Sequence, residues 1–330
     1  MKNAVQTMLW ACIVAALSTI TTAQTQHAFL WTAAGGMQDL GTLGGTNSYA
    51  LGINASGQVV GMGGRSDGTY DAFRWTSATG MQDLGSLGGL GSTATAINAG
   101  GQIVGRAYRA DGGYHAFLWT SSGGMQDLGN LGGDGNSEAL GINDNGQVVG
   151  YSFTPSNEHA FVWTQTGGMQ DLGTLGGSIS VATGINATGN VVGYSLGRTP
   201  ENQAFAWSPA AGMKTLRNLG GNRGYAYAIN RSTIVGSWSN SSAVSTAYSW
   251  TKAKGVHDLP SLGGNFSQSV AINTMGQIVG YSTTTGDSAF RAVLWSTTGG
   301  VTDLGTLGGS NSSAWGINDS GMIVGNADLQ

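Results

Sequence analysis

Short apolar runs alternate with glycine-rich polar turns along the whole chain, and the pattern repeats about every 44 residues. One tryptophan in an apolar run marks each repeat, at Trp31, Trp75, Trp119, Trp163, Trp207, Trp250 and Trp295. An LGG triplet, an Ile-Asn pair and a Val-Gly pair accompany it in fixed order, and the residues GGMQDLGTLGG are identical at 35–45 and 167–177. The chain therefore holds seven copies of one unit, and the seven tryptophans are predicted to lie in its core.

Each unit reads as four short β-strands joined by turns. In the third unit these are HAFLWT, GMQDLGNL, EALGIN and GQVVGYS, at 115–120, 124–131, 138–143 and 146–152. We find no window with the period of an amphipathic helix. Many of the 58 glycines, such as Gly146, stand where a hairpin needs a left-handed residue. The units are therefore predicted to be all-β.

Four strands in about 44 residues match one blade of a β-propeller, and seven blades lie within the usual range. We predict a seven-bladed β-propeller of four-stranded blades, with the ring closed by strands from both ends, 322–327 beside 27–32. An open β-solenoid is the alternative, but that fold needs atypical capping repeats. The AxGIN segment is expected innermost, because alanine and glycine suit a crowded channel.

The first residues have the features of a secretory signal peptide. A lysine precedes an unbroken apolar run at 8–17, which is shorter than the roughly 20 residues needed to span a bilayer. Small residues precede a predicted cut after Ala23. An N-terminal core helix and a lipoprotein signal at Cys12 are the alternatives. We expect a signal peptide at 1–23 and a single propeller domain at 24–330, exported to the periplasm or outside the cell.

Composition narrows the possible partners and cofactors. Cys12 is the sole cysteine, so the domain has no disulfide framework, no thiol nucleophile and no cysteine-ligated zinc. The chain carries 13 basic and 17 acidic residues, which is not the basic footprint of a nucleic-acid binder. No second apolar run predicts membrane insertion after cleavage of the signal peptide. We expect a monomer without cofactor or metal.

The repeat also resembles a known family. Its order of HAFLWT, GGMQDLGTLGG and GINxxGQVVG is similar to the HAF repeat of bacterial extracellular proteins, named for the His-Ala-Phe found here at 27–29, 115–117 and 159–161. The resemblance covers 27–327 and implies an exported repeat protein, but no activity. Units five and six depart from it, because KTLR stands at 214–217 and Pro260 replaces a glycine.

Six aspartates share one position of the repeat: Asp39, Asp83, Asp127, Asp171, Asp258 and Asp303. They could form a ring of acids or metal ligands. We expect them instead to accept hydrogen bonds from backbone N–H groups of the adjoining turns. Acid–base catalysis needs a pair with differentiated environments rather than six equivalent groups. No set of histidines has metal-ligand spacing.

Two sets of connections differ freely among the units, one after the Val-Gly strand and one after the LGG triplet. In an up-and-down meander alternate connections lie at the same end, so both sets are expected on one face, the variable-loop face. Free drift of unconstrained loops is the alternative explanation. Arg223 and Tyr225 in one such loop, and Trp238 in the next, form the candidate ligand-binding site. Trp315 is expected to pack between blades.

The function favoured by these features is that of an exported, non-catalytic binding or scaffold propeller. An aromatic ring and a guanidinium group could stack on a glycan or anchor a protein partner. The alternative is a secreted carbohydrate-active enzyme, a hydrolase or lyase, on the same face. Its acids would come from the variable loops, with Asp67, Asp111, Asp134, Glu138, Glu158 and Glu201 available. Two of them about 5 to 9.5 Å apart in a cleft would favour glycoside hydrolysis.

Overall fold

The computed structural model describes residues 24–330 except 133–134, 198–200, 217–218 and 243. In this part of the chain the secondary structure is 28 β-strands and one 3-10 turn, η2 (Thr285–Asp287), which agrees with the all-β prediction. No helix among the described residues has the length and apolar character needed to cross a bilayer. The predicted signal peptide at 1–23 lies outside the described residues.

The strands form antiparallel groups of four. The first strands are β3 (Gly44–Ile53), β7 (Gly88–Ile97), β11 (Ser137–Ile142), β15 (Ser180–Ile185), β19 (Arg223–Ile229), β23 (Gly263–Ile272) and β27 (Gly308–Ile317). The second strands are β4 (Val59–Arg65), β8 (Ile103–Arg109), β12 (Val148–Phe153), β16 (Val191–Leu196), β20 (Thr233–Ser239), β24 (Ile278–Thr284) and β28 (Ile323–Leu329).

The outer half of each group follows the same plan. The third strands are β5 (Tyr70–Thr76), β9 (Tyr114–Thr120), β13 (Glu158–Thr164), β17 (Asn202–Ser208), β21 (Ser245–Thr251), β25 (Phe290–Trp295) and β1 (Gln26–Thr32). The fourth strands are β6 (Gly80–Asp83), β10 (Gly124–Asp127), β14 (Gly168–Asp171), β18 (Gly212–Thr215), β22 (Gly255–Asp258), β26 (Val301–Asp303) and β2 (Gly36–Asp39). One parallel bridge, Ser245 to Phe266, joins β21 to β23 and merges two groups into one sheet.

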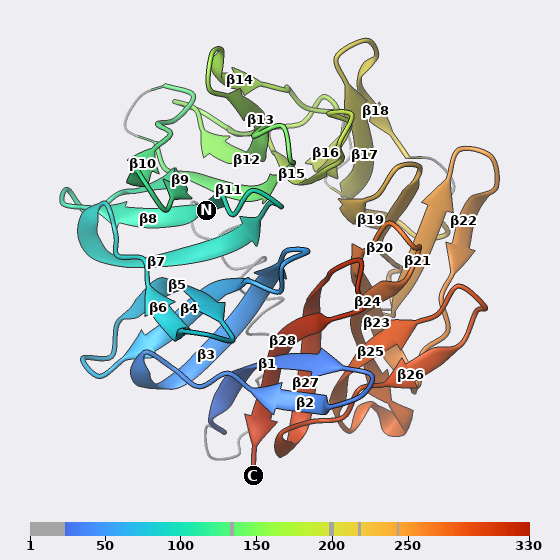
Figure 1. Cartoon of the computed structure of the whole chain (residues 1–330). Coiled ribbons are helices and arrows are strands. Elements are labelled where there is room, and N and C mark those ends of the chain that lie inside the picture. Colours follow the sequence, from blue (N-terminus) through green and yellow to red (C-terminus); the bar gives the residue numbers. More distant parts are fainter. Residues whose placement is uncertain (1–23, 133–134, 198–200, 217–218, 243) are drawn as a thin grey trace.

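One sheet is built from both ends of the chain, as predicted. Its order is β2-β1-β28-β27, so a strand near the N-terminus pairs with the last strand. The register places His27 opposite Ala327 and Trp31 opposite Ile323. Within this pairing the buried amide of Gln26 donates to Asp328 Oδ1 at 2.7 Å. Figure 1 shows these blue and red strands side by side.

The AxGIN strands lie innermost, as predicted. Each first strand contacts the next around the centre, in the order β3, β7, β11, β15, β19, β23, β27 and back to β3. The approach is close: a Cβ atom on Gly52 would lie 3.3 Å from the Cα atom of Ala96 on the neighbouring strand. The glycine of each Val-Gly pair allows a second close contact, between the first and second strands. A Cβ atom on Gly61 of β4, for example, would overlap the main-chain oxygen of Tyr49 on β3.

The hydrophobic core is divided into clusters that lie between neighbouring sheets. Seven of these clusters each contain one of the seven repeat tryptophans, and an eighth is built around Tyr151, Val181 and Tyr194. Trp75, Trp163 and Trp295 are buried, whereas the other four are partly buried against their clusters. The phenylalanines two positions before several of them, such as Phe29, have no exposed surface.

Seven asparagines, one in each turn between a first and a second strand, link these turns into a closed circle at one end of the innermost strands. The side-chain Nδ2 of each donates to the main-chain oxygen of the next at 3.0 to 3.2 Å, through Asn54, Asn98, Asn143, Asn186, Asn230, Asn273 and Asn318. The last bond, from Asn318 to Asn54, closes the circle. The Oδ1 of Asn54 also accepts from the main chain of Ser56 and Gln58, so each asparagine shapes its own turn as well.

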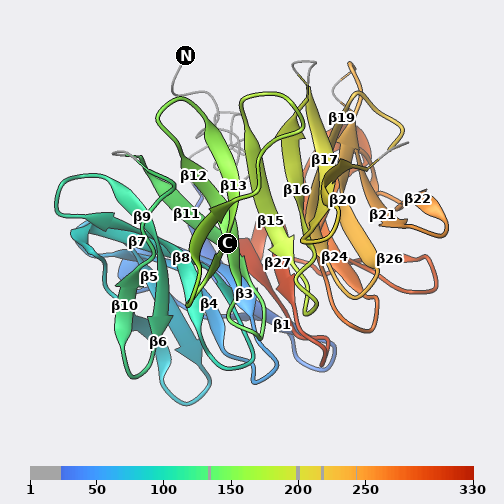
Figure 2. The same cartoon turned by 90° about the horizontal axis from the view of Figure 1, so that it is seen from above.

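Figure 2 shows that the connections gather at the two opposite ends of the strands. Because successive strands in each group are antiparallel, the asparagine turns lie at one end. The connections from second to third strands, and those that lead to the next group, lie at the other end. The two sets of variable loops therefore share one face.

Candidate functional site

A cavity of about 600 Å³ runs along the centre of the molecule, enclosed by the innermost strands. Its lining reaches inward to isoleucines such as Ile53 and Ile229, but does not include the asparagine circle. At the other end it includes Arg223, Asn240 and Ser245, which lie where the strands meet the variable loops. The cavity therefore opens toward the variable-loop face.

The middle of the cavity wall is formed by the second residue of the AxGIN segments. These residues are Leu51, Thr95, Leu140, Thr183, Tyr227, Val270 and Trp315. The Thr95 hydroxyl donates to the main-chain oxygen of Ala139 at 2.7 Å, and the Thr183 hydroxyl donates to that of Ala226 at 2.7 Å. Because both hydroxyls are bonded to the backbone, this layer offers a ligand mainly apolar surface.

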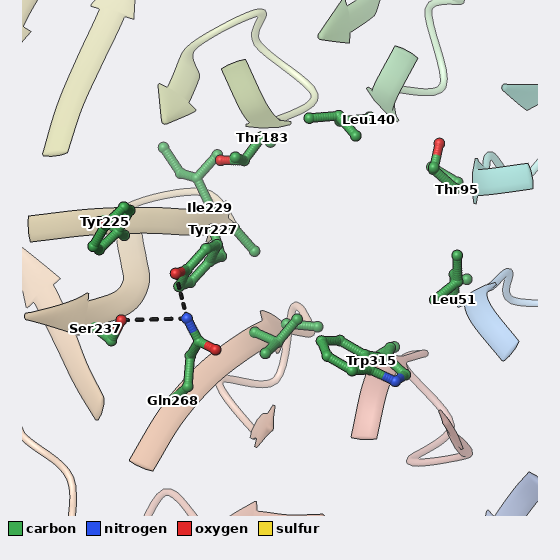
Figure 3. A pocket seen from close by; sticks show the side chains of 18 of the residues that line it. Leu51, Thr95, Leu140, Thr183, Tyr225, Tyr227, Ile229, Ser237, Gln268 and Trp315 are labelled. Atoms are coloured by element: carbon green, nitrogen blue, oxygen red, sulfur yellow. Dashed lines mark hydrogen bonds between the residues drawn. The ribbon is translucent and has the colours of Figure 1, made fainter. Parts of the chain in front are cut away.

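One side of the wall is aromatic. Tyr225 and Tyr227 project from the same face of β19 with nearly parallel rings, 6.2 Å between centroids (Figure 3). Phe266 on β23 and Trp315 on β27 also line the cavity. The buried Gln268 amide donates to the Tyr227 hydroxyl and to Ser237 Oγ, the latter at 3.3 Å, so it holds this side in place.

Trp315 packs between two sheets, as predicted, and it also lines the cavity. It was predicted to pack between blades, and its ring does meet Tyr281 of the preceding sheet at 5.6 Å between centroids. Its side chain also lines the central cavity, with Nε1 donating to Asn326 at 2.6 Å. The position of Trp315 in the repeat could have predicted this, because the second residue of each AxGIN segment lies on an innermost strand.

The opposite part of the wall holds a buried ion pair. Arg106 Nη1 lies 3.2 Å from Glu138 Oε2, and the Tyr151 hydroxyl donates to the same oxygen at 2.8 Å. Glu138 lines the cavity. Burial raises the pKa of the Tyr151 phenol well above its ordinary value, and the Glu138 carboxylate adds to the shift. The phenol therefore stays a hydrogen-bond donor to Glu138.

A second buried carboxyl lies near this pair. Burial raises the pKa of Glu158 to about 7, and the charge of Glu138 contributes to the increase. Glu158 is only 6% exposed, but it is not part of the cavity lining. Of the acids available to the enzyme alternative, Glu138 alone among the described residues lines the cavity, and Asp134 lies outside the described residues.

Two of the remaining acids are held by local contacts, whereas Glu201 is not part of the cavity lining. Asp67 accepts hydrogen bonds from the main chain and hydroxyl of Thr69, and Asp111 pairs with Arg109. Among the described residues no three histidine, cysteine or acidic side chains gather as a metal site would require.

The structure separates the three residues of the predicted ligand site. Arg223 and Tyr225 line the cavity, whereas Trp238 does not. Trp238 lies in strand β20 opposite Gly224, while Ser237 lies opposite Tyr225. Side chains alternate between the two faces of a strand, so Trp238 points away from the face that carries Arg223 and Tyr225. The prediction of one joint site is therefore corrected: its two halves lie on opposite faces of the sheet.

Trp238 instead contacts one of the six repeat aspartates. Five of these aspartates accept a main-chain N–H two residues later at 2.7 to 2.8 Å: Asp39, Asp83, Asp127, Asp171 and Asp303. Asp258 lacks that donor because Pro260 stands there. Its Oδ1 accepts from Trp238 Nε1 at 2.8 Å. Trp238 also packs on the cluster that contains Leu219, which gives it a structural role.

At the mouth of the cavity, Arg223 lies at the exposed end of β19 opposite Ser239. It forms no ion pair with any residue that the structure describes. Ser239, Asn240 and Ser245 line the cavity beside it and offer hydroxyl and amide groups. The mouth thus combines a guanidinium group with neutral hydrogen-bonding groups.

Comparison with solved structures relates the chain to β-propeller proteins. A TolB protein from Agrobacterium tumefaciens has a TM-score of 0.52 at 12% identity, covering 94% of this chain and 100% of its own. TolB from Acinetobacter baumannii has a TM-score of 0.51 at 12% identity, covering 77% of this chain and 68% of its own. A puromycin hydrolase variant has a TM-score of 0.58 at 13% identity, covering 89% of this chain and 55% of its own.

At these identities the likeness establishes the fold and nothing further about activity. No protein-family model matches the chain, and no curated protein sequence matches it significantly.

Proposed function

We propose that the chain is an exported, non-catalytic binding protein with seven blades that holds a ligand in the mouth and interior of its central cavity. The observation that carries this proposal is the cavity itself. Its volume of about 600 Å³ lies in the range of small-molecule sites, and its walls are apolar with a few polar groups at one end. The variable loops surround that end, which is where a rigid scaffold places recognition.

The count of seven blades is supported by the asparagine circle and by the seven innermost strands in cyclic contact. The sheet of eight strands counts as two blades because a single parallel bridge joins its halves. The resemblance of the repeat to the HAF repeat supports export. Mass spectrometry of the mature protein is expected to find Gln24 as its first residue. An intact N-terminus or a lipid on Cys12 would contradict this part of the proposal.

The cavity favours an apolar ligand over a glycan in its interior. A sugar needs many hydrogen-bond partners, but the middle layer contributes aliphatic and aromatic side chains and threonines whose hydroxyls are already bonded. A glycan or a protein partner would contact only the rim, where Arg223 and Tyr225 lie. We therefore place a small, largely apolar ligand in the cavity and treat rim contacts as additional.

A cavity-filling variant tests this site. Leu140→Trp narrows the cavity, and Trp315 at the equivalent position of β27 shows that the innermost strand accommodates tryptophan. Glycan arrays and thermal-shift screens of small organic compounds are run on both proteins. We expect a small ligand to bind the wild type and to bind Leu140→Trp at least about tenfold more weakly. A ligand with equal affinity for both would place the site elsewhere.

The enzyme alternative has one observation in its favour. Glu138 and Glu158 are two neighbouring carboxyl groups, and the raised pKa of Glu158 suits a general acid. Against it, Glu158 does not line the cavity, and Glu138 is engaged by Arg106 and Tyr151. A reducing-sugar assay on polysaccharides decides between the two functions. Turnover that disappears in Glu158→Gln would replace our proposal by the enzyme, whereas binding without turnover supports it.

A further inference from the structure

We infer that the central cavity binds an amphipathic organic anion, with a ring-bearing apolar body inside the cavity and an acidic head at Arg223. The inference rests on the proposed function and names the ligand class of that same site. It follows from three features of the cavity: the depth of its apolar part, the distribution of aromatic rings and the sign of the charge at its mouth.

The apolar part is deep enough to enclose a ligand body. Below the mouth lie two successive apolar layers, the second residues of the AxGIN segments and then isoleucines such as Ile53, Ile142 and Ile229. Water in such a space has few partners, so an apolar body that displaces it gains the free energy of leaving water. The cavity lining extends inward as far as the isoleucines, so the apolar part spans both layers.

The wall is asymmetric in a way that favours rings over a plain acyl chain. Tyr225, Tyr227, Phe266 and Trp315 line one side, from β19 to β27, whereas aliphatic residues such as Leu51 line the other. Aromatic side chains pack well against rings in offset or edge-to-face geometry. A ring-bearing body can therefore contact the aromatic side while its opposite edge meets the aliphatic side.

The charges at the cavity select an anion. Among the described residues two charged side chains line it, Arg223 at the mouth and Glu138 in the wall. Glu138 is neutralised by the buried guanidinium of Arg106 at 3.2 Å. Arg223 has no ion-pair partner in the described part of the chain, and the Ser239 hydroxyl and the Asn240 amide lie in the same lining. A carboxylate or sulfonate would meet a guanidinium fork and neutral donors, whereas a cationic ligand would be repelled.

Two fluorescent probes with the same ring system test the inference. One is 8-anilinonaphthalene-1-sulfonate, and the other is N-phenyl-1-naphthylamine, which lacks the sulfonate. We expect the sulfonate probe to bind at one site per chain, about tenfold more tightly than the neutral probe. Arg223→Gln should reduce the affinity for the sulfonate probe to that of the neutral probe and leave the neutral probe unchanged. Leu140→Trp should weaken both.

Two matched controls guard against nonspecific effects. Arg231→Gln makes the same charge change at the other end of β19, in the asparagine turn, and should alter neither probe. Leu90→Ser removes an apolar side chain that is 83% exposed outside the cavity lining, and should leave both affinities unchanged. A thermal melt of each variant checks that the fold is retained.

Two results would overturn the inference. If the neutral probe enters the cavity but Arg223→Gln does not change the affinity for the sulfonate probe, the ligand is not selected as an anion, and the proposed binding function still stands. If Leu140→Trp changes neither probe, organic anions of this class do not occupy the cavity. The compound and glycan screens then decide the proposed function independently, because they do not use these probes.

Discussion

Pro260 and Trp238 are two departures from the repeat that compensate for each other. A proline has no N–H, so the turn after Asp258 cannot supply the donor that Asp39 and its equivalents receive. The Trp238 indole supplies that donor at 2.8 Å from β20, which is separated from the strand of Asp258 by β21. An aromatic residue that resembled a ligand anchor in the sequence is thereby explained by the local hydrogen bonds of its own blade.

Trp238→Phe tests this compensation. The change keeps an aromatic ring but removes the N–H, so we expect the free energy of unfolding to fall by about 1 kcal/mol. Urea denaturation measures it. In a Pro260→Gly background the main chain regains an N–H, and the same change should cost less. An equal cost in both backgrounds would show that the bond to Asp258 is not the cause. Affinity for a cavity ligand should not change.

Glu158 makes stability depend on pH. Its pKa is about 7 in the folded protein and near the ordinary 4.5 in the unfolded chain, so the folded state binds the extra proton between these values. The contribution of this group is therefore fully present below about pH 4.5 and is lost as pH rises through about 7.

The variant Glu158→Gln removes this dependence. We expect it to be more stable than the wild type by about 2 to 3 kcal/mol at pH 8, and the difference should vanish below pH 4.5. Urea denaturation across this pH range measures the difference. A constant difference at all pH values would indicate a packing effect rather than a titration.

At the scale of strands, glycine in the second strand decides how closely the innermost strand can approach. The Val-Gly glycines stand opposite a main-chain oxygen of the first strand, where any Cβ atom would overlap it. In the pairing of β3 with β4, a register shift between Ala50 and Gly52 accompanies this close contact. The repeat of Val-Gly in the sequence is thus a packing requirement of two paired strands.

Gly61→Ala measures that requirement. The added methyl group would meet the main-chain oxygen of Tyr49, and we expect a loss of about 2 to 3 kcal/mol in the free energy of unfolding. Gly300→Ala is the matched control, because its nearest atom would be Ser296 Oγ at 3.6 Å. Thermal or urea unfolding of both variants tests the prediction. Equal stability of the two would contradict it.

Strand alternation also explains which site residues could be predicted. The sequence placed Arg223 and Tyr225 near the variable loops, and both line the cavity. From the sequence, Trp238 was expected in a loop, but strand β20 extends past it. Its pairing with Gly224 places its side chain on the other face of the sheet. To tell which face of the sheet a side chain occupies, one needs the exact register of the two paired strands. The sequence does not give this register where the strands run into loops of variable length.

At the scale of the whole molecule, the period of the repeat predicted the all-β fold, the innermost strands and the closing pair. It could not predict the cavity, because the repeat position that lines it holds five different residue types among its seven copies. Whether Leu51, Thr95 and Trp315 fill the centre or leave space depends on their volumes and rotamers in three dimensions. The hydrogen bonds that occupy the threonine hydroxyls also lie between blades, where no single repeat reveals them.

Removal of the last strand tests closure of the ring. A chain that ends at residue 321 lacks β28, so β1 and β27 lose their common partner and expose unpaired edges. We expect its midpoint of thermal unfolding to fall and its size-exclusion profile to shift toward aggregates. A chain shortened only by Gln330 is the control and should match the full chain. A monomeric, equally stable truncation would contradict closure by β28.

The asparagine circle has a sense of rotation. Every amide points toward the next repeat and every carbonyl is approached from the previous one, so the seven bonds form a head-to-tail circuit with neither a first nor a last member. Chains of hydrogen bonds polarise one another, and here the polarisation returns to its origin. Conversion of any one amide to a carboxylate, by mutation or by deamidation, would set oxygen against oxygen and leave the circuit open at that point.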